Sequence, residues 1–580
     1  MSQKIILGTV RDAKNKNPLA FCAVTSLGTG KSTVTNDEGA FKLVVALESD
    51  SIVFTYIGYR AKQIPVLALM QSPVVFMEAS GIELPEVKVD GNQSYLFKIL
   101  DNCRKKIRAS VDRHSKAYFV MQSDITGFPV EMMECYYNAL TSTHKVKKLE
   151  LKNGRIGLAE TPDHGFFLSE NTAHVLAQIS LVEKNEYIPG LPFQLTEARL
   201  QKIYSLQDEF SFADDATYHI RFSPLEANGK FFNGEVWIDK NSYDLRKINL
   251  WVENTTTHPF EPVWHEDALS GVTLFFSETF SKLNDDWVPG NINFTCRLTY
   301  HANMEYRAKK INPGVDWGTD TAERVRVITT SGSYTFYDFD NGFILPYYDY
   351  GDGQSDYRKI LSLPFNESFW SGDPHLLYTE KQKTALRFFN DNGVLINYRE
   401  NNTMKTISRI AGEFFKGANL MWSDSNRLSF TKNNLDSLLK KDSLSAGSAF
   451  RVDQYKLKTQ IFLDINPAGD SLSHFSAAVF DVGDSFYNLP PSATADCFLN
   501  ILFDLAEIER RKMENVMAGN KLGIRQMDSV YASATAALNT QTAIFIKESE
   551  SGQNLKGLLK WNQYAEDNLG IDNMKLFGLK

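Results

Sequence analysis

The chain contains, near its middle, the stretch Phe232-Asn233-Gly234-Glu235-Val236-Trp237-Ile238-Asp239, followed after Lys240-Asn241-Ser242 by Tyr243-Asp244-Leu245-Arg246-Lys247-Ile248. Apolar and polar side chains alternate in both halves, which is the period of a half-buried strand. The residues that join the halves, Asp239-Lys240-Asn241-Ser242, are turn formers. We therefore predict a β-hairpin, and we expect it to set the fold of the region around it.

Further β-rich segments lie on both sides of this hairpin, at residues 118–121, 218–222 and 272–276. A helix is predicted before them, because apolar residues recur with helical spacing at Leu96, Ile99, Leu100, Cys103 and Ile107. A helix followed by many strands predicts an α+β domain over residues 95–300.

The hairpin and the order of helix and strands around it resemble the half-barrel of lipoprotein carriers. They also resemble the related domain that follows regulatory-like modules in envelope proteins. The resemblance implies a curved sheet whose concave face can hold an acyl chain or a peptide. The inward apolar residues can equally form a plain core against the helix, and we favour that simpler alternative.

Residues 4 to about 90 contain short strand-like runs separated by Gly, Pro, Asn and Asp, which predicts a small β-sandwich. Motifs that occur in order resemble the carboxypeptidase-regulatory-like domain of bacterial outer-membrane proteins. They are Gly8-Thr9-Val10-Arg11-Asp12, Pro18-Leu19-Ala20-Phe21, Thr35-Asn36-Asp37-Glu38-Gly39-Ala40-Phe41 and Tyr56-Ile57-Gly58-Tyr59. The resemblance implies such a domain over residues 1–90 and a place in the cell envelope.

The first residues enter a strand at Lys4-Ile5, with no charged n-region, apolar h-region or cleavage site. A cytoplasmic protein and an exported protein in its mature form both fit this start. Because the regulatory-like module usually follows a signal peptide in its family, we expect the mature exported form. We expect it in the periplasm or at the cell surface, associated with the outer membrane.

A second helix is predicted at Phe498-Leu499-Asn500-Ile501-Leu502-Phe503-Asp504-Leu505-Ala506-Glu507-Ile508-Glu509-Arg510-Arg511-Lys512. Its context resembles the helix that carries His-Glu-x-x-His-Phe-Asp in a family of secreted zinc proteases. In that motif two His at i and i+4 bind zinc and the Glu activates water. Here Phe498, Leu499 and Leu502 stand at those positions, and none can bind a metal or move a proton.

No other residue replaces the missing ligands. His474 is the only histidine after His375, and it precedes the helix. Asp504 and Glu507 could face one side of the helix, but arginines follow Glu507 at the spacing of helix salt bridges. The order of segments from about residue 418 still resembles the protease family. We therefore predict a degenerate zincin-like α+β domain over residues 405–580.

Residues 301–400 are rich in aromatic residues and irregular, which predicts a connecting region. Aromatic residues beside carboxylates are typical of sugar platforms, and also of interfaces, where Tyr and Trp dominate contact energies. A hydrolase acting on glycan or peptide would draw its carboxylates from Asp338, Asp340, Asp349 or Asp352. Exposed loops or interdomain packing explain the same pattern.

The 580 residues are 43% hydrophobic and 23% charged, which fits several globular domains. A net charge of -8 without a basic cluster argues against nucleic acid as a partner. No apolar run approaches the roughly 20 residues that span a bilayer, so no transmembrane segment is predicted. The cysteines show neither a disulfide framework nor metal-ligand spacing, and we expect most to be buried thiols.

These observations predict a multidomain, mainly β protein: a β-sandwich, a half-barrel-like α+β domain, an aromatic connecting region and a degenerate zincin-like α+β domain. We expect no catalytic, cofactor-binding or metal-ligating residue and no cofactor. The predicted function is a noncatalytic interaction or assembly subunit of the envelope, with protein partners and with glycan or lipid as further candidate ligands. The alternatives are a hydrolase and a carrier of lipid or hydrophobic peptide.

Overall fold

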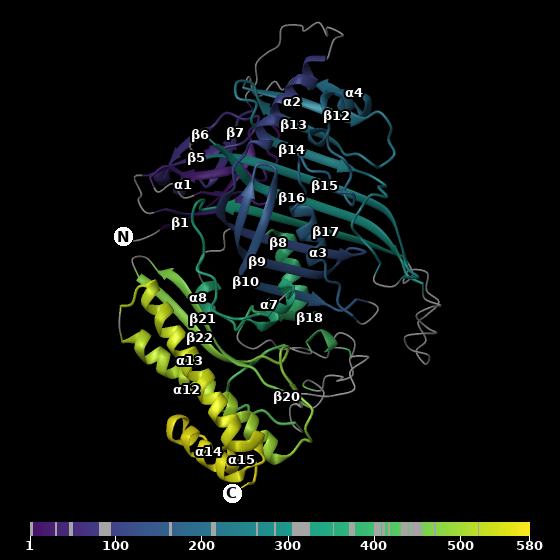
Figure 1. The fold of residues 1–580 in the computed structure, drawn as a ribbon. Helices are drawn as coiled ribbons and strands as arrows, with labels where there is room; N and C mark the ends of the chain where they lie inside the picture. Colours follow the sequence, from purple (N-terminus) through teal and green to yellow (C-terminus); the bar gives the residue numbers. More distant parts are fainter. Residues whose placement is uncertain are drawn as a thin grey trace. The chain divides into compact units, whose positions relative to one another are not determined.

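The computed structural model describes residues 4–28, 32–45, 50–79, 94–161, 165–209, 216–262, 265–283, 286–303, 325–351, 353–370, 377–399, 408, 412–415, 418–430, 435, 439, 455–468, 471–519 and 521–579. The chain forms two compact units (Figure 1). Unit 1 consists of Met1–Phe343, Gly372–Leu395 and Thr403–Thr406. Unit 2 consists of Ile344–Ser371, Ile396–Asn402 and Ile407–Lys580.

Unit 1 begins with a β-sandwich of two small sheets, with strand orders β4-β1-β7 and β3-β2-β5-β6. Alternate residues of the strands point between the sheets, where Phe41 and Phe54 meet with ring centroids 5.5 Å apart. The predicted turn before β4 forms at Gly39, whose φ of 74° suits glycine. The elements are β1 (Lys4–Asp12), β2 (Ala23–Ser26), β3 (Ser32–Val34), β4 (Ala40–Val45), β5 (Ser51–Thr55), β6 (Lys62–Pro65), α1 (Val66–Gln71) and β7 (Val74–Met77).

The rest of unit 1 is built on an 11-stranded sheet with the order β11-β12-β13-β14-β15-β16-β17-β8-β9-β10-β18. Its long strands are visible in blue and teal in Figure 1. The strands are β8 (Arg113–Ile125), β9 (Phe128–Ser142), β10 (Lys145–Ala159), β11 (Tyr204–Asp208), β12 (Thr217–Pro224), β13 (Asn233–Asp239), β14 (Leu245–Val252), β15 (Ala268–Leu283), β16 (Asp286–His301), β17 (Val325–Tyr337) and β18 (Gly393–Ile396).

The predicted hairpin is confirmed as β13 and β14 of this sheet. Its turn closes because a side-chain oxygen of Asp239 accepts hydrogen bonds from the amides of Asn241 and Ser242, at 2.9 and 3.0 Å. The predicted helix is confirmed as α2 (Ser94–Arg108). Its buried residues are the predicted stripe: Leu96, Ile99, Leu100, Cys103 and Ile107.

The two faces of the large sheet are covered differently. We call the face that carries Ile248 and Tyr334 the inner face; α3 (Glu170–Ala177) packs on it, with His174 3.4 Å from the Tyr334 hydroxyl. The helix α2 packs with α4 (Glu197–Ile203) and η1 (Pro192–Gln194) beside the edge strand β11. The opposite, outer face packs against α9 (Glu380–Asn392), whose Phe389 ring lies against Gly157.

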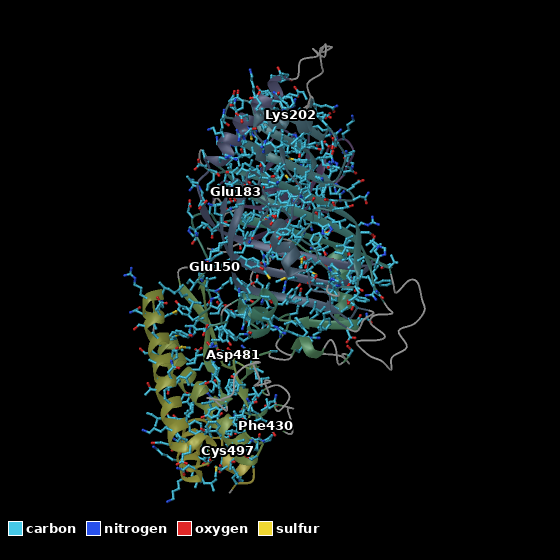
Figure 2. All side chains as sticks on the ribbon, turned by 45° about the vertical axis from the view of Figure 1, so that its right-hand side comes forward. Glu150, Glu183, Lys202, Phe430, Asp481 and Cys497 are labelled. Carbon is cyan, nitrogen blue, oxygen red and sulfur yellow. The ribbon has the colours of Figure 1, made fainter. Side chains whose placement is uncertain are left out.

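Unit 2 packs two long helices, α12 (Ala493–Ala518) and α13 (Ile524–Ser549), against a sheet with the order β19-β22-β21 (Figure 1). Phe430 and Cys497 belong to its core (Figure 2). The other elements are α7 (Asp356–Ser362), α8 (Glu367–Trp370), η2 (Glu413–Phe415), β19 (Leu420–Met421), β20 (Tyr455–Lys456), β21 (Thr459–Ala468), β22 (Ser471–Phe480), β23 (Phe486–Tyr487), η3 (Glu550–Gly552), α14 (Leu555–Leu569) and α15 (Asn573–Leu576).

The predicted fold class, multidomain and mainly β with α+β parts, is confirmed. All five cysteines are buried and free, as expected. Within the described residues, no helix combines the length and the apolarity that crossing a membrane requires. The division into four domains at residues 90, 300 and 400 remains a prediction.

Candidate functional site

The three positions of the lost zinc motif lie in the core of unit 2. Phe498, Leu499 and Leu502 on α12 are all 0% exposed. The Phe498 ring stacks on Phe545 with centroids 5.1 Å apart. The chain also closes around Phe498 at Gly552, where an added Cβ would come within 3.0 Å of the Phe498 Cβ. Apolar packing therefore fills the space in which a zinc site would need polar ligands.

One turn further along α12, Asp504 is fully buried and fully partnered. Its carboxylate accepts hydrogen bonds from Trp422 Nε1 at 2.8 Å, from Arg427 Nη2 at 2.7 Å to both oxygens, and from Asn573 Nδ2 at 2.7 Å. Burial raises the pKa of Asp504, and the Arg427 guanidinium opposes that shift. These contacts bind α12 to two distant segments of unit 2, so Asp504 has a structural role.

Glu507, the other acidic candidate on this helix, forms the predicted salt bridges. Arg510 binds it through Nε and Nη2 at 2.7 and 2.8 Å, and Arg511 Nε binds it at 2.8 Å. Ion pairs of this spacing stabilise a helix without any catalytic role. The carboxylate is therefore engaged by two arginines and is not placed as a general base.

His474 on β22 also has a partner in unit 2. Its Nε2 lies 2.9 Å from a carboxylate oxygen of Glu514 on α12. That hydrogen bond raises the pKa of His474, and burial opposes the shift. The pair holds the β22 strand against α12.

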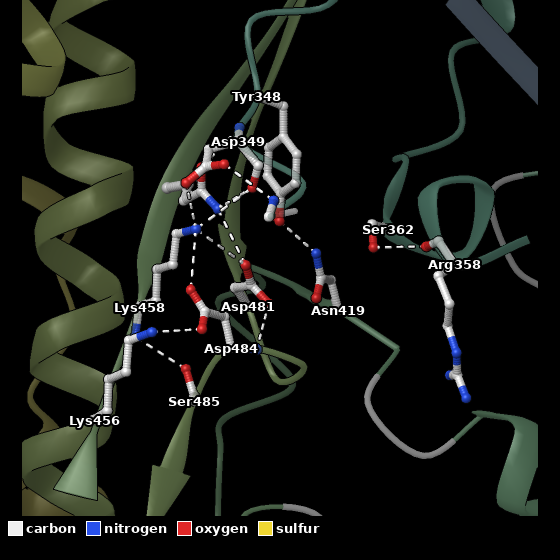
Figure 3. A network of polar contacts seen from close by, with 12 residues as sticks. Tyr348, Asp349, Arg358, Ser362, Asn419, Lys456, Lys458, Asp481, Asp484 and Ser485 are labelled. Carbon is white, nitrogen blue, oxygen red and sulfur yellow. Dashed lines mark hydrogen bonds and ion pairs between the residues drawn. The ribbon is translucent and has the colours of Figure 1, made fainter. Parts of the chain in front are cut away.

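In the aromatic region, Asp349 joins a network of ion pairs around Lys458 (Figure 3). Lys458 Nζ lies 2.7 Å from Asp349, 3.3 Å from Asp484 and 3.7 Å from Asp481. The hydrogen bond from Lys458 lowers the pKa of Asp349. A carboxylate held ionised by a lysine is poorly suited to act as a general acid.

Two other predicted carboxylates of the hydrolase alternative, Asp338 and Asp340, belong to unit 1. Asp338 accepts from Lys116 Nζ at 2.6 Å, and Asp340 accepts from Arg113 Nη1 at 3.1 Å. Asp352 lies outside the described residues. The carboxylates that are described are thus each paired with a cation, and Asp349 belongs to unit 2 whereas Asp338 and Asp340 belong to unit 1.

The inner face of the large sheet holds one carboxyl in an apolar row. The strand register pairs one residue of each of eight neighbouring strands into a row on this face. Every residue of the row is at most 2% exposed. In sheet order they are Ile220, Val236, Ile248, Glu278, Ile292, Tyr334, Phe119 and Cys135. Glu278 therefore has Ile248 on one side and Ile292 on the other.

Within the part of the chain that the structure describes, no residue donates a hydrogen bond to the Glu278 side chain and no cation pairs with it. Burial raises its pKa well above the ordinary value for Glu. A neutral carboxyl at this position can donate one hydrogen bond and accept others inside an apolar layer. It is the group on the inner face whose presence packing does not explain.

Other buried acids of the same sheet contrast with Glu278 because they have donors. Glu131 accepts from Ser123 Oγ at 2.8 Å and from the amide of Ser169 at 2.9 Å. Glu134 accepts from the Tyr118 hydroxyl at 2.8 Å and from Arg155 Nε at 2.6 Å. Both carboxylates therefore have hydrogen-bond donors, as buried polar groups in proteins usually do.

The sequence carries a signal for Glu278 that lies outside any motif. The alternation along β15 places Leu274, Phe276 and Phe280 on buried positions, and Glu278 occupies a position of the same phase. A charged residue in the buried phase of a strand is uncommon unless it has a partner. Extending the predicted strand 272–276 by two residues places Glu278 at a position where an apolar residue is expected.

A pocket lies between the end of α2 and strands of the large sheet, and Glu278 is not part of its lining. Its volume is about 220 Å³, and its lining includes Ile107 at the end of α2, Leu245 on β14 and Val288 on β16. Strands β14 and β16 are the two neighbours of β15, which carries Glu278. Within the described residues, no group of three or more His, Cys, Asp and Glu side chains could hold a metal ion.

Comparisons with known proteins place the N-terminal domain. Residues 6–89 match the family model of the CarboxypepD_reg-like domain, which confirms that prediction. No curated protein matches the chain. The zincin-like interpretation of residues 405–580 remains a prediction.

Solved structures with similarity to the chain include proteins from three bacteria. The MucA/MucB complex of Pseudomonas aeruginosa matches at 10% identity and a TM-score of 0.17, over 41% of this chain and 92% of that one. A LolA superfamily protein from Nitrosomonas europaea matches at 8% identity and a TM-score of 0.15, over 45% of this chain and 97% of that one. A DUF1329 family protein from Desulfovibrio piger matches at 11% identity and a TM-score of 0.18, over 46% of this chain and 96% of that one. TM-scores this low support no inference about ligand or partner.

Proposed function

We propose that this chain is a noncatalytic interaction or assembly subunit of the bacterial cell envelope, associated with the outer membrane and lying in the periplasm or at the cell surface. The observation that carries the proposal is the packing of Phe498, Leu499 and Leu502 into the core of unit 2. Zinc hydrolysis needs two ligands and a base at these places, and apolar core residues supply neither.

Two further observations support this proposal. The carboxylates that a hydrolase would need, Asp338, Asp340 and Asp349, are each paired with Lys or Arg. The CarboxypepD_reg-like domain at residues 6–89 is a module expected in envelope proteins. Binding is therefore a better account of the chain than catalysis.

The test combines metal analysis with the identification of a stoichiometric partner. The full-length protein, isolated in its native host after cross-linking in intact cells, is expected to contain less than about 0.1 zinc per chain and to cleave no casein. It is also expected to carry one envelope protein in a fixed ratio. Stoichiometric zinc together with casein cleavage would overturn the proposal, and so would a chain that cross-links to no protein at all.

A second candidate function, a carrier of an apolar molecule, is favoured by Glu278. A neutral carboxyl between Ile248 and Ile292 would hydrogen-bond the hydroxyl, amide or amine of a molecule whose remainder contacts the apolar inner face. Native mass spectrometry of gently purified protein would then find a bound apolar molecule that Glu278→Leu loses. The matched control is Glu131→Gln, which alters a partnered acid of the same face and should keep the ligand. Finding no bound molecule would reject this candidate.

A further inference from the structure

The exposed side of the β4-β1-β7 sheet carries large apolar side chains. On β1, Ile5 and Leu7 are 53% and 55% exposed, because alternate residues of the strand turn away from the core. On the neighbouring strand β7, Val74 and Phe76 are 40% and 37% exposed. The register of β1 with β7 puts both pairs on the same face. We call this face, with the cations described next, the β1 surface.

Cations surround these apolar residues. Lys42 on β4 stands opposite Leu7, and Arg11 on β1 stands opposite Phe76. Lys16 Nζ lies 4.3 Å from the centre of the Phe76 ring, and Lys62 Nζ donates to the Phe76 carbonyl at 2.9 Å.

The same face lacks acidic groups on its strands. Among the described residues of β1, β4 and β7, the only acid is Asp12, which is 6% exposed and accepts from the Tyr59 hydroxyl. Glu78, which directly follows β7, is exposed and pairs with Arg60 at 3.9 Å. The whole chain has a net charge of -8. The β1 surface is therefore a positive, apolar face on an acidic protein.

The folding of the domain does not explain this face. The core of the sandwich is supplied by the opposite residues of the same strands, such as Ile6, Val10 and Val75. Single exposed apolar residues are ordinary, whereas several together on one face usually mark a contact surface.

The chemistry of the face distinguishes between occupants. Protein interfaces are depleted in Lys, which argues against a protein partner for a surface with Lys16, Lys42 and Lys62 around its apolar residues. An anionic lipid surface matches both properties, because it accepts apolar side chains at the boundary of headgroups and acyl chains and attracts cations to its phosphates.

We propose that the β1 surface docks on an anionic phospholipid surface. Ile5, Leu7, Val74 and Phe76 enter the headgroup boundary, and the cations contact lipid phosphates. The proposal rests on the envelope function above only for the identity of the membrane. It adds a lipid contact that needs no protein partner.

The experiment is co-sedimentation of the full-length protein with vesicles. Binding is expected to vesicles of phosphatidylglycerol and phosphatidylcholine (1:1) and to be at least about tenfold weaker to phosphatidylcholine alone. Leu7→Ser with Phe76→Ser should weaken binding by about tenfold or more. Lys16→Gln with Lys42→Gln should weaken it by about fivefold per cation and reduce its dependence on salt.

The matched control is Phe128→Ser, which removes an apolar side chain that is 66% exposed at the β8–β9 turn of the same unit. It should bind vesicles like the unchanged protein, and unchanged thermal unfolding would confirm that every variant is folded. Equal binding by the Leu7/Phe76 variant overturns the proposal, as does binding to poly-glutamate but not to vesicles. Zinc and cross-linking results test the envelope function separately, so the two proposals can fail independently.

Discussion

Two buried carboxyl groups, Asp504 in unit 2 and Glu278 in unit 1, differ in their hydrogen-bond partners. Asp504 is 0% exposed and receives hydrogen bonds from Trp422, Arg427 and Asn573. Glu278 is 2% exposed, and no described residue donates to it. The first therefore holds three segments together, and the second interrupts an apolar layer.

This difference separates a structural acid from a candidate ligand-binding acid. Removing a carboxylate from water is unfavourable unless hydrogen bonds and an opposite charge replace the water. Asp504 receives that replacement from its own fold. Glu278 would receive it from a bound molecule, or would stay neutral through its raised pKa.

The largest effect is expected at the partnered acid. Asp504→Ala should lower the free energy of unfolding of unit 2 by roughly 3–5 kcal/mol, because it leaves the buried Arg427 guanidinium without an opposite charge. Urea unfolding, followed by tryptophan fluorescence and circular dichroism, measures it.

The control for Asp504 is a double-mutant cycle with Arg427→Met. The double variant should be more stable than the sum of the single effects predicts, because the uncompensated charge is gone. A loss below about 1 kcal/mol in Asp504→Ala would contradict the structural role assigned to this group.

At Glu278 the expected effect has the opposite sign. Glu278→Leu should raise the free energy of unfolding by about 1–3 kcal/mol, since it removes a buried polar group that has no described partner. The same substitution at the partnered Glu131, which accepts from Ser123 and Ser169, should be destabilising. If both substitutions destabilise equally, Glu278 has a partner in the folded chain.

The effect of Glu278 on the free energy of unfolding should also depend on pH. Because burial raises the pKa of this acid, the folded state binds a proton that the unfolded state releases above about pH 4.5. Stability of the unchanged protein should therefore fall as pH rises from about 5, by at most about 1.4 kcal/mol per pH unit. Glu278→Gln should flatten that part of the profile, measured by urea unfolding between pH 5 and 8.

The comparison also shows what the sequence could reveal. The hairpin at β13 and β14 and the helices α2 and α12 follow from local periodicity, so they were predictable. The partners of Asp504 were not, because Trp422 lies 82 residues away and Asn573 lies 69 residues away along the chain. Only the folded chain brings those donors together.

For Glu278 the limit was different. Its position in the buried phase of β15 was readable, but the row that surrounds it is formed by strands from distant parts of the sequence. Likewise, the helix with Phe498 was predicted, whereas the stacking of that ring on Phe545 depends on how α12 and α13 pack. Patterns predict which residues are buried, and tertiary packing decides what they meet.

A smaller effect is expected at His474, which is neither fully buried nor free. Its pKa is raised by the hydrogen bond to Glu514, so its contribution to stability is complete below about pH 6.5 and is lost as pH rises through the folded-state pKa. His474→Gln should cost about 1 kcal/mol at pH 6 and clearly less at pH 8. Thermal unfolding at the two pH values measures this.

A matched control for His474 is Ser476→Ala, which removes a neutral partner of the same Glu514 carboxylate. Its effect should not change between pH 6 and 8. If the loss from His474→Gln were instead the same at both pH values, the pair would not be linked to protonation of the histidine.

The smallest effect is expected at Asp349. Like Asp504 it is paired with a cation, but unlike Asp504 and Glu278 it is exposed. Its side chain is 69% exposed while that of Lys458 is 20% exposed. Solvent screens such a pair, so Asp349→Asn should change the free energy of unfolding by less than about 0.5 kcal/mol, and 1 M salt should remove the difference. The same variant tests the hydrolase alternative: a large loss of glycan or peptide hydrolysis with unchanged stability would assign Asp349 a chemical role. Under the binding function proposed here, neither property changes, because an exposed carboxylate held by Lys458 affects only local charge.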